Sequence, residues 1–183
     1  MNKTNLFKYY RIPFILSISL AVVLVTQIYK GDTVDLILLI LGSLLGTFFL
    51  DLDYFLHTYV LEPADQFSGM LKDYIKSKDY AGAFNYIIFH SDQVENKTLN
   101  SALFQISLIF FSIFLVRSDV SIFFKALVIS IQLNSVFRFF YFYFQGHAND
   151  WFWILKKTPG TFFIIIYNLV IISSIGLAIY SFK

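Results

Sequence analysis

Long apolar stretches recur along the chain and constrain its fold more than any other feature. Five of them are predicted to be membrane-spanning helices: residues 12–29, 34–61, 101–116, 121–145 and 160–182. A helix of about 20 residues crosses the hydrocarbon core of a bilayer, which is about 30 Å thick. Only 14% of the residues are charged, against about 25% in soluble domains, and the mean hydropathy is +0.67. The sequence therefore predicts one all-α polytopic membrane domain, residues 1–183, embedded in the lipid bilayer.

The connection formed by residues 62–100 is too long for an ordinary loop. Its apolar residues recur at helical spacing, with Phe67, Met70 and Leu71 on one side and Lys72 and Asp73 on the other. This pattern is typical of amphipathic helices that lie on a membrane surface or cover a site beneath it. We therefore expect interfacial helices here, on the cytoplasmic side.

Composition excludes several classes of protein. The chain has no cysteine, so it has neither a disulfide framework nor a thiolate metal site. A net charge of +2 is too small to indicate a nucleic-acid partner. The first apolar stretch is followed by YKGDTVD rather than by a small-residue cleavage site, which predicts a retained helix.

Lysine and arginine predict the orientation, because they are enriched in cytoplasmic loops. Nine of them fall on one side of the predicted spans: Lys3, Lys8, Arg11, Lys72, Lys76, Lys78, Lys97, Lys156 and Lys157. Four fall on the other side: Lys30, Arg117, Lys125 and Lys183. With five spans, this predicts that the N-terminus is cytoplasmic and that the C-terminus is outside.

Ionisable side chains gather near the predicted cytoplasmic end of the second span, in FLDLDYFLH. Asp53 and His57 are four residues apart and share a helical face. A carboxylate and an imidazole at this spacing are a common start of a divalent metal site, although both could instead cap a helix end. The outer half of the predicted spans has few ionisable groups, which argues against a small-solute transporter.

Arg138 lies in the fourth predicted span, at a similar depth. An arginine inside a membrane usually has an anionic partner, so we expect an ion pair with Asp51 or Asp53. The alternative is a side chain that extends to lipid phosphate. His147, three residues before Asp150, is a further candidate for the same site.

Gly42 and Gly46 form a GxxxG pattern in the second span. Glycines at this spacing allow two helices to approach closely.

Three segments together resemble the membrane-bound, metal-dependent hydrolases of the LexA-regulated inner-membrane family. LGSLLGTFFLDLDYFLH is similar to that family's glycine-containing apolar helix, which ends in Asp-x-Asp. ENKTLNSALF stands where the family has an HR-x-x-T-H-S motif, and LNSVFRF stands where it has a later His and Asp. Asp51 and Asp53 match the family directly.

Four positions depart from the family's pattern. The histidines of its second motif fall on Glu95 and Asn100, and its later His and Asp fall on Asn134 and Arg138. The resemblance therefore implies either a distant active relative or a descendant that has lost metal ligands. In such a descendant, Arg138 would supply the positive charge that a metal supplies in the family.

In an active relative, the resemblance implies hydrolysis of a lipid-like or phosphoester substrate. Asp51, Asp53 and Arg138 would be the catalytic residues, with Arg138 binding an anionic group. A divalent ion (Zn, Mn or Fe) would be held by Asp51, Asp53 and His57 with help from His147 or His90, and it would activate a bound water. A different class remains open, namely a non-enzymatic membrane subunit, immunity protein or adaptor. Its Asp/Arg cluster would be structural, and its partner would be another protein or a second copy of the chain.

Overall fold

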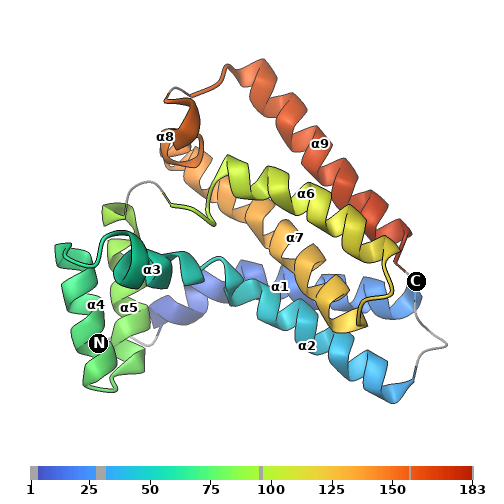
Figure 1. Cartoon of the computed structure of the whole chain (residues 1–183), viewed down its shortest axis with the longest axis horizontal. Coiled ribbons are helices and arrows are strands. Elements are labelled where there is room, and N and C mark those ends of the chain that lie inside the picture. The colour runs from blue at the N-terminus through green and yellow to red at the C-terminus, as the bar shows by residue number, and fades with distance from the viewer. Residues whose placement is uncertain (1–3, 28–31, 95–96, 157, 183) are drawn as a thin grey trace.

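The structure, a computed structural model, describes residues 4–27, 32–94, 97–156 and 158–182 (Figure 1). It is 82% helical, with no strand in the described residues, which agrees with the predicted all-α class. Its elements, in chain order, are α1 (Thr4–Gln27), α2 (Thr33–Phe49), α3 (Leu52–Leu56), η1 (His57–Leu61), α4 (Gln66–Lys76), α5 (Tyr80–His90), η2 (Ser91–Gln93), α6 (Ala102–Arg117), α7 (Ile122–Phe144), α8 (Ala148–Trp151), η3 (Trp153–Leu155) and α9 (Thr161–Tyr180).

Three helices are long and apolar enough to cross a membrane: Tyr9–Gln27 of α1, all of α7, and all of α9. The predicted span 34–61 is bent by 53° between α2 and α3, and it adds a fourth crossing if the two parts are counted together. The predicted span 101–116 corresponds to α6, which has 16 residues and is therefore only about 24 Å long. The structure thus supports a membrane protein with three or four such helices by length and composition. The end of the first predicted span, residues 28–29, lies outside the described residues.

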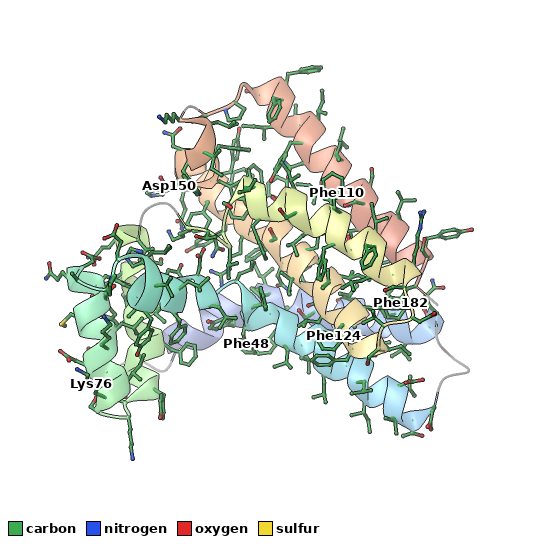
Figure 2. All side chains as sticks on the ribbon, in the orientation of Figure 1. Phe48, Lys76, Phe110, Phe124, Asp150 and Phe182 are labelled. Carbon is green, nitrogen blue, oxygen red and sulfur yellow. The ribbon has the colours of Figure 1, made fainter. Side chains whose placement is uncertain are left out.

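The outside of the helical bundle is largely apolar, as expected of a surface that faces lipid. Phe110 of α6 and Phe124 of α7 are both exposed, and Figure 2 shows them on the ribbon of the bundle. Ile18 and Val22 of α1 are more than half exposed, as is Ile165 of α9. Soluble proteins rarely expose apolar surface on this scale.

Helix α7 is the centre of the bundle. It packs against α1, α2, α6, α8 and α9, and two-thirds of its candidate span is buried. The hairpin of α4 and α5 projects from one end of the bundle (Figure 1). Helix α4 is amphipathic as predicted, but its buried residues Phe67 and Leu71 pack against protein, in a cluster with Tyr54 of α3 and Ile87 of α5.

Helices α2 and α7 approach each other closely at the GxxxG glycines. A methyl group on Gly42 would collide with the backbone carbonyl oxygen of Phe123. A methyl group on Gly46 would lie 2.5 Å from the Ser130 Cβ. Because the obstacle at Gly42 is backbone rather than a flexible side chain, the two helices could accommodate a larger residue only by moving apart.

We expect Gly42→Ala to lower the free energy of unfolding by about 1–3 kcal/mol, the usual cost of overpacking. Gly176→Ala in α9 is the matched control, since nothing lies within 4 Å of the added methyl group. Unfolding in mixed detergent micelles, followed by circular dichroism, measures both variants. Equal stability of the two would show that the α2–α7 contact does not depend on glycine.

Candidate functional site

Asp51 lies at the bend between α2 and α3 and is 3% exposed. Its carboxylate accepts two hydrogen bonds from different helices. The Tyr10 hydroxyl of α1 donates to Oδ2 over 2.7 Å, and Arg138 of α7 donates through Nη2 to Oδ1 over 2.6 Å. One buried carboxylate thus joins three helices that are far apart in the sequence.

Arg138 is also 3% exposed, and it contacts residues from two other parts of the chain. Besides the ion pair with Asp51, its Nη1 donates to the Tyr9 hydroxyl. The guanidinium carbon lies 4.7 Å from the centre of the Tyr9 ring, within the range of a cation–π contact. The ion pair expected between Arg138 and one of the two aspartates is therefore present, with Asp51.

Asp53 is 1% exposed and has a different role from Asp51. Its carboxylate accepts hydrogen bonds from the backbone N–H of Thr98 at 2.9 Å and from that of Asn100 at 2.8 Å. The Asn100 side-chain amide donates to the same carboxylate at 3.0 Å and to the Leu50 carbonyl at 2.9 Å. Asp53 thereby fixes the segment that leads into α6, whose N-cap is Ser101.

The histidines predicted to join this site have other partners. His57 Nε2 lies 3.5 Å from Asp65 Oδ2, at the start of α4. His147 Nδ1 lies 3.2 Å from Oδ2 of Asp150, a residue of α8 that Figure 2 labels. This second pair is solvent-exposed and local.

Two further residues were connected with the predicted metal site: His90 as a candidate ligand, and Glu95 at a position where the similar family has a histidine. The His90 ring stacks on Tyr86 with 4.4 Å between ring centres, and its Nδ1 lies 3.1 Å from the Tyr86 carbonyl oxygen. Glu95 lies outside the described residues. Among the residues whose placement is described, no three Asp, Glu, His or Cys side chains are grouped so that they could hold a metal ion.

The metal implied by the resemblance therefore does not fit the donors as they are arranged. The carboxylates of Asp51 and Asp53 accept hydrogen bonds from different parts of the chain and do not converge on one point with His57 or His147. A metal would have to displace hydrogen bonds that join α1, α3, α7 and the segment before α6.

Asn134 belongs to a second polar cluster that sequence reasoning did not find. Its Nδ2 donates to the Ser17 Oγ of α1 at 3.0 Å and to the Ser130 carbonyl oxygen at 2.9 Å. Thr47 of α2 donates to the same Ser17 Oγ at 2.8 Å. The spacing of Ser130, Asn134 and Arg138, four residues apart along one face of α7, was the signal that could have revealed a polar stripe.

A cavity of about 670 Å³ lies between α1, α5 and α7, next to the ion pair. Tyr9 and Arg138 line it together with apolar residues, including Ile12, Ile88 and Phe137. The contribution of α5 could not be predicted from the sequence, which placed residues 62–100 only as interfacial helices.

No family model, curated protein or solved structure matches this chain. The resemblance to the metal-dependent hydrolases therefore rests on the sequence motifs alone.

Proposed function

We propose that this chain is a non-catalytic membrane protein, an adaptor or accessory subunit, in which Asp51, Asp53 and Arg138 hold one end of the helical bundle together. The observation that supports this proposal is the commitment of both carboxylates inside the protein. Asp51 is paired with Arg138 and Tyr10, and Asp53 accepts three N–H groups from residues 98–100. A carboxylate that acts as a metal ligand or a nucleophile needs free lone pairs facing the reacting group.

A metal-dependent hydrolase is the second candidate. The cavity next to Arg138 favours it, because an apolar space of about 670 Å³ would accept a lipid-like substrate. This function would require Asp51 and Asp53 to exchange several hydrogen-bond donors for a metal, which would loosen the contacts among α1, α3 and α7.

We also propose that the N-terminus and the α4–α5 hairpin face the cytoplasm and that the protein lies in the inner membrane of a bacterium. Supporting this orientation is the excess of lysine and arginine at the N-terminus and in residues 62–100. The start of α1 and the end of α9 lie at opposite ends of the molecule (Figure 1), as they would with the C-terminus outside.

We expect the purified chain to carry zinc, manganese and iron only at far below one equivalent, and to hydrolyse neither phosphoesters nor lipid esters. Elemental mass spectrometry on protein prepared without chelator or a His-tag measures the metal content. Asp51→Asn is run beside it, since the amide keeps the size and one acceptor oxygen of the carboxylate. Near-stoichiometric metal in the wild type that is lost from a folded Asp51→Asn variant would replace this proposal with the hydrolase.

A further inference from the structure

The cavity beside the ion pair has the size and lining of a ligand site. Its volume of about 670 Å³ falls within the range of about 300–1,000 Å³ that small-molecule sites occupy. Apolar side chains from all three surrounding helices line it: Ile12 of α1, Ile88 and Phe89 of α5, and Phe137 and Phe144 of α7. Phe89 and Phe144 are strongly exposed, so the cavity opens to the apolar exterior of the bundle.

Arg138 provides a charged hydrogen-bond donor in this cavity, which Tyr9, Tyr141 and Gln145 also line with polar groups. Its side chain lines the space although it is only 3% exposed overall. A guanidinium has five N–H donors, and the contacts with described residues use one for Asp51 and one for the Tyr9 hydroxyl. The other N–H groups remain for an acceptor that enters the cavity.

The charge balance of the site selects a neutral acceptor. The carboxylate of Asp51 already offsets the positive charge of Arg138. A second anion would be a buried charge without its own partner, which is costly in a medium of low polarity. A carbonyl oxygen can accept from the guanidinium without this penalty.

Arg138 would lie near lipid ester groups in a membrane whose interface is level with the end of α7. Arg138 lies six residues before the end of α7 at Phe144, about 9 Å along the helix axis. Tyr9 and Tyr141 line the same cavity, and tyrosine is enriched at the interface between hydrocarbon and headgroups. The apolar part of the cavity would then lie alongside acyl chains.

We propose that this cavity binds one acyl chain of a glycerolipid, whose ester carbonyl accepts a hydrogen bond from the Arg138 guanidinium. The site goes beyond the proposed function, because lipid could occupy it in an adaptor as well as in an enzyme. It requires neither a metal nor a catalytic residue.

Native mass spectrometry of the full chain in mild detergent, after addition of 1-palmitoyl-2-oleoyl-phosphatidylcholine, tests the proposal. Ile12→Trp places an indole in the cavity. Ile15→Trp is the matched control, since Ile15 is on the same helix and equally exposed (53% against 50%) but does not line the cavity. We expect a one-to-one lipid adduct in the wild type and in Ile15→Trp, and an apparent affinity about tenfold lower in Ile12→Trp, the change produced by about 1.4 kcal/mol.

Ile88→Trp fills the same cavity from α5 and should give the same loss, so the test does not depend on one variant. An adduct that persists in both Ile12→Trp and Ile88→Trp would overturn the site and assign the lipid to the outer surface. So would an equal loss in Ile15→Trp. A parallel titration with palmitate compares a carboxylate with the neutral ester of phosphatidylcholine as the hydrogen-bond acceptor. Tighter binding of palmitate would overturn the preference for a neutral ester.

Discussion

Replacing Arg138 with methionine is expected to lower the free energy of unfolding by about 3–5 kcal/mol, the usual cost of removing one partner from a buried ion pair. The variant would leave the Asp51 carboxylate buried, with the Tyr10 hydroxyl as its only described donor. It would also remove the contact with the Tyr9 ring. Unfolding in mixed detergent micelles, followed by the fluorescence of Trp151 and Trp153, measures the loss.

Two controls make this result specific to the ion pair. Arg117→Met removes an exposed arginine at the end of α6 and should change stability by no more than about 0.5 kcal/mol. Asp51→Asn combined with Arg138→Met leaves no unpaired buried charge, so it should recover much of the stability lost by Arg138→Met alone. Additive effects in this double-mutant cycle would show that Asp51 and Arg138 do not depend on each other.

Residue type and spacing were sufficient to predict that the chain is all-helical and that the partner of Arg138 is an anionic group. A chain with 57% hydrophobic residues and long apolar stretches has few alternatives to helices in lipid. An arginine in such a stretch needs an anion, and Asp51 and Asp53 were the aspartates at a similar depth. Which aspartate Arg138 would contact depended on the bend between α2 and α3. The residues at this bend are Leu50 and Asp51, and neither is a glycine or proline from which a bend could be predicted.

The remaining features depend on contacts between distant segments. The carboxylate of Asp53 accepts hydrogen bonds from the backbone N–H groups of Thr98 and Asn100. Almost every residue has a backbone N–H, so the sequence does not indicate which of them will donate to a given side chain. His57 and Asp53 share a helical spacing, yet His57 faces Asp65, because η1 is followed by a turn into α4. The predicted metal site required Asp53 and His57 to face the same ligand, but Asp53 accepts hydrogen bonds from residues 98–100 and His57 contacts Asp65.

The second large effect is expected at Asp53. Asp53→Ala removes the acceptor of three N–H groups, and each buried donor left without a partner costs about 1–3 kcal/mol. Since Thr98 is exposed and its N–H can bind water, we expect a total loss of about 2–4 kcal/mol. Hydrogen–deuterium exchange should accelerate at residues 98–101 before it does so in α7. Asp119→Ala, at an exposed residue of the α6–α7 connection, is the control and should leave both measurements unchanged.

The order of exchange distinguishes a local anchor from a general loss of stability. A second contact holds the same segment, because the Trp153 indole N–H donates to the Lys97 carbonyl oxygen at 3.0 Å. If Asp53 is the main anchor, Trp153→Phe alone should affect exchange at residues 98–101 less than Asp53→Ala does, and the two variants together should release the start of α6. Faster exchange in Trp153→Phe than in Asp53→Ala would assign the anchoring role to η3 and leave Asp53 free for another function.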